Sequence, residues 1–238
     1  MASPLVLLHG FTQTRRSWRR TIAALDGAPR VLAPDLPGHG LAAERPASFP
    51  ACIAYVRALA GERFALGGYS MGGRIALATA VALGDHVERL VLIGASPGIA
   101  DDAERERRRA ADEALAGRIA SIGVEAFARE WGEQPLFAGQ PERVAAAAHA
   151  DRLRNTPGGL AAALRGLGTG VMDPLWDRLG ELRMPVTLVV GERDEKFRGV
   201  AGQMAERIPS ARVVVVPGAG HAAHLERPDV VAGYLGGG

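Results

Sequence analysis

The sequence predicts a single α/β domain in which a mostly parallel sheet is covered by helices on both faces, with a helical cap inserted before the last two strands. Short apolar runs alternate with helical stretches along the 238 residues, a pattern typical of parallel strands joined by helical crossovers. A glycine-flanked serine also stands where one apolar run meets a helical pattern. The expected strands lie near residues 4–8, 30–34, 64–69, 87–93, 186–191 and 212–217.

The first two strands each lead into a short polar loop. The first ends at His9-Gly10-Phe11, and a helical segment follows around residues 18–25. In a strand-to-helix loop of this kind, the backbone N–H of Phe11 can join that of Met71 in binding an oxygen that gains negative charge. The second strand runs into the tight turn 35–40, where we expect His39 to stabilise the loop and not to catalyse.

The third strand ends in Gly68-Tyr69-Ser70-Met71-Gly72, and the helical pattern 74–83 follows directly. A G-x-S-x-G motif at a sharp strand-to-helix turn indicates a nucleophile elbow, because the glycines permit close backbone approach and the serine hydroxyl is exposed. A serine is a poor nucleophile or base by itself. It needs a histidine to take its proton and a carboxylate to orient that histidine.

Loops after the last two strands supply both groups. Asp194 follows the strand 186–191 and is the candidate acid, with Glu192 as the alternative. His221 follows the strand 212–217 after a glycine-rich approach and is the candidate base, ranked ahead of His224. The order serine, acid, histidine is that of α/β-hydrolases.

The stretch 100–177 shows no strand pattern and contains charged, alanine-rich helical segments, among them 103–119 and 142–153. We expect it to form a cap over the site, with the core built from residues 1–99 and 178–238. No internal repeat or long linker interrupts this organisation.

Composition limits the partners and the location. The formal charge is only +2, and basic residues are not interleaved with aromatic ones, so nucleic acid is not an expected partner. No apolar run approaches the roughly 18 residues of a membrane span, and no leader pattern precedes the first strand, which predicts a cytoplasmic protein. Cys52 is the single cysteine and is expected to pack in the core. We expect no metal or cofactor, and a monomer or small homo-oligomer.

Basic residues cluster around the expected site. The only lysine, Lys196, lies two residues after Asp194. Arg74 falls in the first turn of the helix after Ser70, where a cation opposes the helix dipole. Something anionic is therefore expected beside it, either a carboxylate of the cap or a carboxylate of the substrate.

Several motifs together resemble the family of 2-succinyl-6-hydroxy-2,4-cyclohexadiene-1-carboxylate synthases, the menaquinone-pathway members of the α/β-hydrolase superfamily. The resemblance covers nearly the whole chain. It includes the stretches 8–11, 35–40, 68–74, 191–197 and 218–224. In the cap it includes 104–112, 131–137, 152–160 and 167–170.

This resemblance implies elimination of pyruvate from a polycarboxylate substrate, with the triad acting as a base. It also implies that arginines bind the carboxylates and that three further residues line the site. The arginines are Arg74, Arg108 and Arg152, and the lining residues are Tyr69, Trp131 and Lys196. The sequence departs from the family pattern at Leu41 and at Arg154, and it leaves open which of Arg152 and Arg154 faces the pocket.

Three other functions are compatible with a triad on this fold. A serine carboxylesterase would use Ser70 to form an acyl-enzyme. A carbon–carbon bond hydrolase is a further alternative, and a non-catalytic receptor is the third, because fold does not fix function. The arginine set favours the synthase, since an esterase for neutral esters has no use for converging guanidinium groups.

Overall fold

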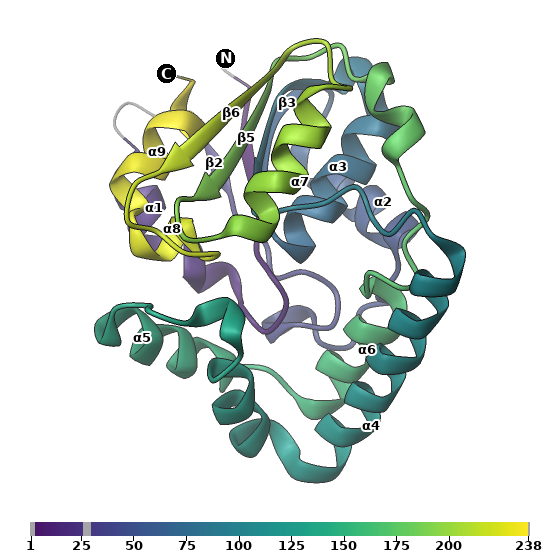
Figure 1. The fold of residues 1–238 in the computed structure, drawn as a ribbon, viewed down its shortest axis with the longest axis vertical. Coiled ribbons are helices and arrows are strands. Elements are labelled where there is room, and N and C mark those ends of the chain that lie inside the picture. The colour runs from purple at the N-terminus through teal and green to yellow at the C-terminus, as the bar shows by residue number, and fades with distance from the viewer. Residues whose placement is uncertain (1–2, 26–29, 238) are drawn as a thin grey trace.

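The computed structural model describes residues 3–25 and 30–237, and in this part of the chain six strands form one parallel sheet (Figure 1). Their spatial order is β2-β1-β3-β4-β5-β6. The strands are β1 (Leu5–Leu8), β2 (Val31–Leu32), β3 (Phe64–Tyr69), β4 (Val87–Ile93), β5 (Val186–Gly191) and β6 (Ala211–Val216). The predicted α/β class and the positions of all six strands are confirmed. Strand β2 is shorter than expected because Pro34 has no N–H with which to extend the ladder.

Helices cover both faces of the sheet. Along β1, Val6 and Leu8 face a core shared with α2 (Phe49–Ala60), α3 (Met71–Leu83) and α7 (Glu195–Ala205). Leu5 and Leu7 face the opposite core, which is shared with α1, α8 and α9. These last helices span Arg19–Ala23, Ala223–Glu226 and Pro228–Gly236. Because successive side chains alternate between two buried faces, the central strands β1 and β3 are apolar along their whole length, whereas β4 has two charged residues near its start and the edge strand β6 is partly exposed. Cys52 is buried in the first core, as predicted.

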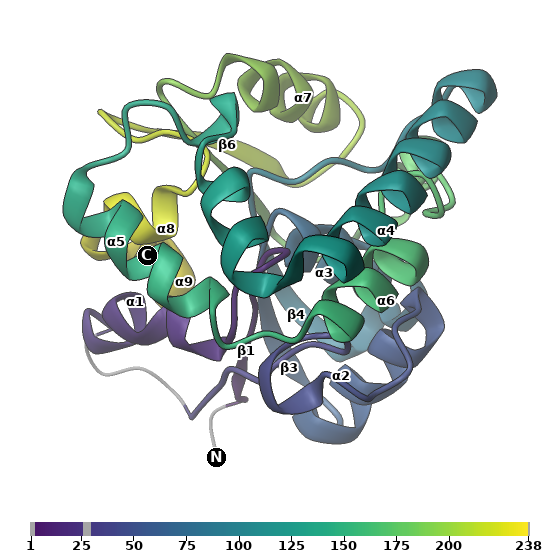
Figure 2. The same cartoon turned by 90° about the horizontal axis from the view of Figure 1, so that it is seen from below.

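The stretch between β4 and β5 is helical and lies beyond the carboxyl ends of the strands (Figure 1). It contains α4 (Asp102–Gly132), α5 (Glu142–Arg152) and α6 (Pro157–Leu167). Figure 2, which views the molecule from this end, shows these helices in front of the sheet. A separate apolar cluster, including Ile119, Phe127 and Leu160, joins α4 to α6.

Local sequence signals explain where several of these helices begin and bend. The side chains of Ser48, Asp101 and Thr156 each accept a hydrogen bond from the backbone N–H three residues later, at the starts of α2, α4 and α6. Helix α4 extends well past the predicted 103–119. Gly123 interrupts it with φ 78° and ψ 170°, which turns the chain, and the helix then resumes in a new direction up to Gly132.

Short 3-10 turns complete the fold: Arg15–Trp18, Gly40–Ala42, Gly84–His86, Pro135–Phe137 and Trp176–Glu181. Among the helices within the described ranges, none is both long enough and apolar enough to cross a membrane.

Candidate active site

Ser70 occupies a strained turn between β3 and α3. Its backbone has φ 50° and ψ −110°, one of two positive φ values among described residues other than glycine. Its N–H donates to the carbonyl of Ile93 at 2.9 Å, which fixes the turn against β4. A Cβ on Gly72 would collide with the carbonyl oxygens of Leu8 and His9. This close backbone approach confirms the geometry that the elbow motif predicts.

Replacing Gly72 with alanine should therefore destabilise the protein. The added methyl meets backbone carbonyls of β1 and the loop after it, which cannot move without disturbing the sheet. We expect Gly72→Ala to lower the free energy of unfolding by about 1 to 3 kcal/mol, measured by urea denaturation. Gly199→Ala is the control, because a Cβ there meets nothing within 4 Å. Equal stability of the two variants would contradict the tight elbow.

The structure joins Ser70, His221 and Asp194 in a hydrogen-bonded chain. His221 Nδ1 lies 2.6 Å from Asp194 Oδ2, and His221 Nε2 lies 3.2 Å from Ser70 Oγ. With its proton on Nδ1, His221 donates a hydrogen bond to the Asp194 carboxylate, and Nε2 can accept one from the Ser70 hydroxyl. Asp194 also accepts from the N–H of Phe197 at the start of α7, so the helix holds the carboxylate in place.

The two alternative residues lie elsewhere. Glu192 is exposed, and its carboxylate accepts from the N–H of Gly218 at 2.8 Å. His224 is fully buried, and its ring packs against those of Trp18 and Tyr69, with centroids 4.7 and 4.2 Å apart. Neither ring nitrogen of His224 has a hydrogen-bond partner among the described residues. The geometry thus favours Asp194 and His221.

Two buried histidines hold the loop after β1. His9 Nε2 accepts from the N–H of Leu36 at 2.9 Å, and His39 Nε2 accepts from the N–H of Thr12 at 3.3 Å. Thr12 has φ 68°, so this loop is also strained and needs such support. The stabilising position of His39 agrees with its prediction, whereas the matching contact of His9 was not anticipated. The position of His9 directly after a buried strand could have indicated that its side chain is buried and holds the loop.

These contacts predict a loss of stability in acid. Burial lowers the pKa of His9 to about 4 and those of His39 and His224 to about 3, with neighbouring histidines adding to the effect at the last two. Between these values and the ordinary 6.5, the unfolded chain binds more protons than the folded chain. The contribution of these neutral rings to the free energy of unfolding is therefore fully present above pH 6.5 and is lost as the pH drops toward 4.

We expect the free energy of unfolding to decrease by up to about 1.4 kcal/mol per pH unit for each of these rings. Urea denaturation at constant ionic strength measures the slope. His39→Gln should reduce it, because one of the three titrating rings is removed. A free energy that stays constant from pH 7 to pH 5 would show that the rings carry protons in the folded chain.

Ser70 and His221 open into a cavity of about 180 Å³. Most of the residues that the sequence assigned to the site line it. They are Phe11, Ser70, Met71, Arg74, Arg108, Trp131, Lys196 and His221. Because α3 begins at Met71, the N–H of Met71 belongs to the helix end that carries partial positive charge.

Arg74 is the most deeply buried cation of this cavity. One guanidinium nitrogen donates to the carbonyl of Leu167 at 2.8 Å. Burial lowers its pKa to about 10, and the nearby Arg108 adds to the effect. Among the described residues no carboxylate forms an ion pair with Arg74, and Asp112 pairs with Arg108 at 2.8 Å. The negative charge of Asp112 on α4 nevertheless partly offsets the lowering of the Arg74 pKa, so a carboxylate of the helical stretch acts on Arg74 at longer range.

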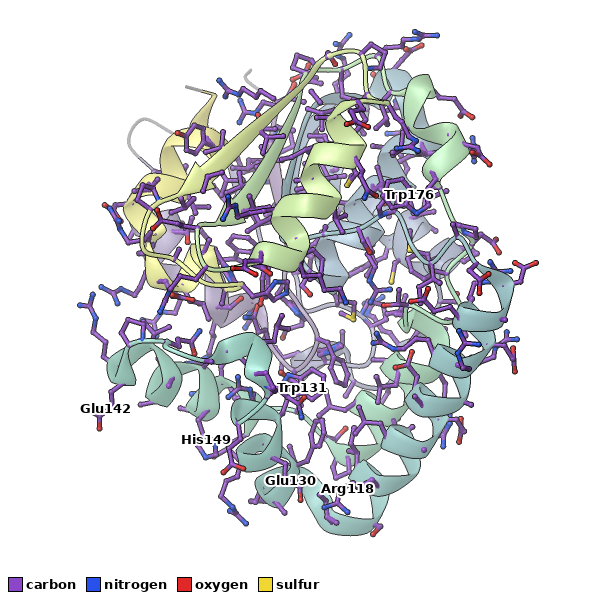
Figure 3. The ribbon with its side chains drawn as sticks, viewed as in Figure 1. Arg118, Glu130, Trp131, Glu142, His149 and Trp176 are labelled. Atoms are coloured by element: carbon purple, nitrogen blue, oxygen red, sulfur yellow. The ribbon has the colours of Figure 1, made fainter. Side chains whose placement is uncertain are left out.

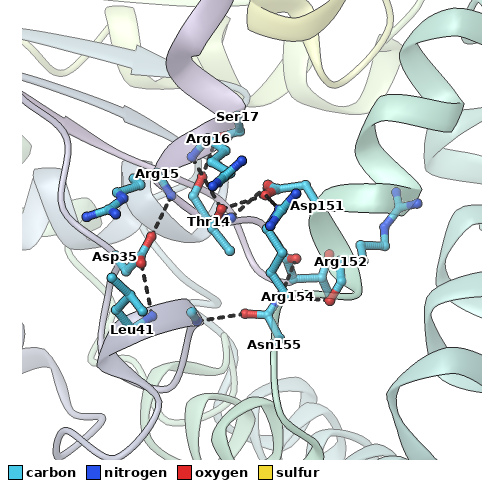
Figure 4. Close-up of polar contacts among 12 residues, drawn as sticks. Thr14, Arg15, Arg16, Ser17, Asp35, Leu41, Asp151, Arg152, Arg154 and Asn155 are labelled. Atoms are coloured by element: carbon cyan, nitrogen blue, oxygen red, sulfur yellow. Dashed lines mark hydrogen bonds and ion pairs between the residues drawn. The ribbon is translucent and has the colours of Figure 1, made fainter.

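Arg152 and Arg154 leave their segment in different directions (Figure 4). Arg152 is buried, and its guanidinium lies 5.3 Å from the centroid of the Phe137 ring. Its Nε has no hydrogen-bond partner in the described structure, and burial lowers its pKa. The Arg154 side chain is 46% exposed and lies 3.9 Å from Asp151. Arg152 is therefore the buried one of the two arginines, although neither of them lines the active-site cavity.

The aromatic candidates differ in position. Trp131 lies at the end of α4, between the helical stretch and the sheet-bearing part of the chain (Figure 3), and packs edge-on against Phe11 with centroids 5.2 Å apart. Tyr69 is buried between His221 and His224 and is absent from the cavity lining, as is Arg152. The position of Tyr69 follows from strand alternation, because successive residues of β3 point to opposite faces of the sheet and Tyr69 therefore points away from the face of Gly68.

Asp112 is a site residue whose position the sequence could have predicted. It lies four residues after Arg108 on α4, the spacing at which helical side chains meet. It is buried, and its second oxygen has no partner within the described residues. Asp112 thus fixes the direction of Arg108 at the cavity wall. Within the described residues, no group of three or more His, Cys, Asp or Glu side chains is placed to hold a metal ion.

The fold and this serine–histidine–aspartate chain together define an α/β-hydrolase. The model of the alpha/beta hydrolase family matches residues 5–234. A putative 2-succinyl-6-hydroxy-2,4-cyclohexadiene-1-carboxylate synthase of Bacillus subtilis is 37% identical, with 94% of this chain and 85% of that protein covered. The synthase of the same name from Salmonella enteritidis is 34% identical, with 98% and 92% covered.

A solved structure gives the same result. MenH from S. aureus superposes with a TM-score of 0.91 at 33% identity, covering 98% of this chain and 91% of its own. The chain belongs to the alpha/beta hydrolase family and, within it, to the family of 2-succinyl-6-hydroxy-2,4-cyclohexadiene-1-carboxylate synthases.

Proposed function

We propose that this chain is a menaquinone-pathway lyase that eliminates pyruvate from 2-succinyl-5-enolpyruvyl-6-hydroxy-3-cyclohexene-1-carboxylate. The observation that carries this proposal is a triad serine opening into a cavity that also holds two arginines, Arg74 and Arg108, and the rim residue Lys196. The synthase names of relatives at 34 and 37% identity support the same reaction.

In this mechanism the triad works as a base. His221 Nε2 accepts the Ser70 proton, and Asp194 stabilises the resulting imidazolium through Nδ1. The serine oxygen then removes the ring proton next to the succinyl ketone, and the N–H groups of Phe11 and Met71 stabilise the enolate oxygen. Electrons of the enolate move through the ring double bond and break the carbon–oxygen bond to pyruvate. The leaving enolate takes up the proton held by His221 and departs as the enol of pyruvate, and the ring becomes a diene. Ser70 keeps the proton abstracted from the ring, which returns the triad to its starting state.

The cationic side chains bind the carboxylates of this substrate. A buried carboxylate needs a charged partner, and the Arg74 guanidinium has a single hydrogen bond to the residues that the structure describes, to the carbonyl of Leu167. Arg108, held by Asp112, and Lys196, at the exposed rim, offer two further contacts. We assign Arg152, Trp131 and Tyr69 to the surrounding wall of the bound state. We also infer that residues 100–177 act as a cap over the core.

Two parallel assays test this proposal. The first measures pyruvate release from the menaquinone intermediate, generated in situ by the preceding synthase, and the second measures hydrolysis of p-nitrophenyl acetate. Fast pyruvate release with slow ester cleavage is the expected result. Ester cleavage without pyruvate release would instead make the chain a serine carboxylesterase. Absence of both activities and of labelling by a fluorophosphonate would indicate a non-catalytic role. A cytoplasmic location and a monomer or small homo-oligomer stay predictions.

A further inference from the structure

A second cavity lies between α5 of the helical stretch and the segment that follows β1 in the core. Its volume is about 330 Å³, and it shares no lining residue with the active-site cavity. One wall comes from the turn Arg15–Trp18 and α1, and the other from α5 and the residues after it. Its lining combines arginines from both walls, the carboxylate of Asp151 and small apolar side chains of α5. We call it the α5 cavity.

The α5 cavity carries a large excess of positive charge. Five arginines line it, and Asp151 is its single acidic residue. The Asp151 carboxylate already accepts from the N–H of Thr14 at 2.8 Å and from its hydroxyl at 2.5 Å (Figure 4). Only Arg154 reaches it, at 3.9 Å.

The remaining four arginines have no ion pair with any described residue. They are Arg16, Arg19, Arg20 and Arg143, and all four are exposed. Arg143 also lies in the first turn of α5, where the helix dipole disfavours a cation. Cations gathered from separate segments around one hollow, with Asp151 as the one acid in the lining, create a local potential that attracts anions. Arg20 and Arg143 also border a neighbouring hollow that contains Glu226 and Asp229, neither of which forms an ion pair with them.

The wall of the cavity away from these arginines is apolar. Val144, Ala147 and Ala148 lie on one face of α5, and Leu225 of α8 lies opposite. The alanines are too small to fill the space between α5 and the core, which leaves room for the body of a small organic molecule. A simple inorganic ion would use the arginines and leave this apolar wall in contact with water.

We propose that the α5 cavity binds a small organic anion in which two or more carboxylates are carried on an apolar ring. The arginines at the mouth pair with the carboxylates, and the ring lies on the alanine face of α5. This site is separate from the triad, so the proposal does not depend on the function assigned above.

Occupancy of the α5 cavity reaches the active site through short connections. Asp151 immediately precedes Arg152, which is buried but does not line the active-site cavity. Asn155 donates to the carbonyl of Thr12 at 2.7 Å, next to Phe11 of the oxyanion loop. A bound anion that bridges α1 and α5 therefore stabilises the segment 151–155, which carries Arg152 and Asn155.

Isothermal titration with naphthalene-2,6-dicarboxylate tests the site. The titration uses an Arg74→Gln background, which weakens carboxylate binding in the active-site cavity. We expect saturable binding, and at least tenfold weaker binding in Arg20→Gln/Arg143→Gln. The control Arg107→Gln/Arg183→Gln removes two exposed arginines outside the cavity and should bind as the background does. The neutral dimethyl ester should not bind.

A cavity-filling variant distinguishes a built site from general attraction to arginines. Ala147→Phe leaves every charge in place but occupies the apolar wall, so it should weaken binding as strongly as the double arginine variant. Circular dichroism verifies that each variant is folded. Binding that survives both variants, equal loss in the control pair, or no saturable binding to the background would overturn the proposal.

Discussion

Replacing Ser70 with alanine should lower kcat for pyruvate release by at least about a thousandfold while the fold stays intact. The hydroxyl that His221 deprotonates is removed, and no other described side chain takes its place 3.2 Å from Nε2. Alanine tolerates φ 50° about as well as serine does, so the elbow is retained. Steady-state kinetics measures the loss, and far-UV circular dichroism verifies the fold.

Ser96→Ala is the matched control, because Ser96 lines the same cavity but lies outside the hydrogen-bonded chain. It should retain kcat within a few-fold. Near-normal turnover in Ser70→Ala would remove the serine from the mechanism. Equal losses in the two variants would assign both serines to the general polarity of the cavity.

Replacing Arg74 with alanine should reduce kcat/KM for the polycarboxylate substrate by about a hundredfold. A hydrogen bond to a charged group is worth about 1.5 to 3 kcal/mol, and the substrate carboxylate would lose a buried charged partner. Hydrolysis of p-nitrophenyl acetate should change far less, because that ester carries no carboxylate. The ratio of the two kcat/KM values is the measured quantity.

Arg74→Lys keeps the positive charge and loses the planar fork, so it should fall between wild type and Arg74→Ala on the polycarboxylate substrate. Arg63→Ala, which removes an exposed arginine paired with Glu88, should leave both reactions unchanged. If Arg74→Ala lowered both reactions equally, Arg74 would have a structural role through its bond to the carbonyl of Leu167.

The arginines show how one cavity can select a substrate on a fold shared by many hydrolases. Triad geometry alone fits ester hydrolysis and elimination equally well. Arg74 carries a buried charge without an ion-pair partner in the described protein, and Asp112 holds Arg108 at the wall beside it. Because burying unpaired charge is costly, this arrangement favours a ligand that brings its own negative charge.

Much of the fold could be predicted because its signals are local. Apolar runs of strand length, the glycines around Ser70 and the loops after β5 and β6 depend on residues adjacent in sequence. The order serine, acid, histidine led to Asp194 and His221, which the structure places beside Ser70, since the carboxyl ends of parallel strands meet at one edge of a sheet. The short β2 and the resumption of α4 after Gly123 were missed, because each depends on a single residue that stops or turns an otherwise favourable pattern.

Neighbouring residues along the chain thus specify the strands, the elbow and the side chains from which a triad could form. Packing between distant segments buries Arg152 and not Arg154, and it sets Tyr69 against His221. The same packing leaves Arg74 without an ion pair among the described residues and forms the α5 cavity. The physical reason is that backbone conformation follows from neighbours along the chain, whereas the burial and pairing of a long charged side chain depend on which distant segments pack around it.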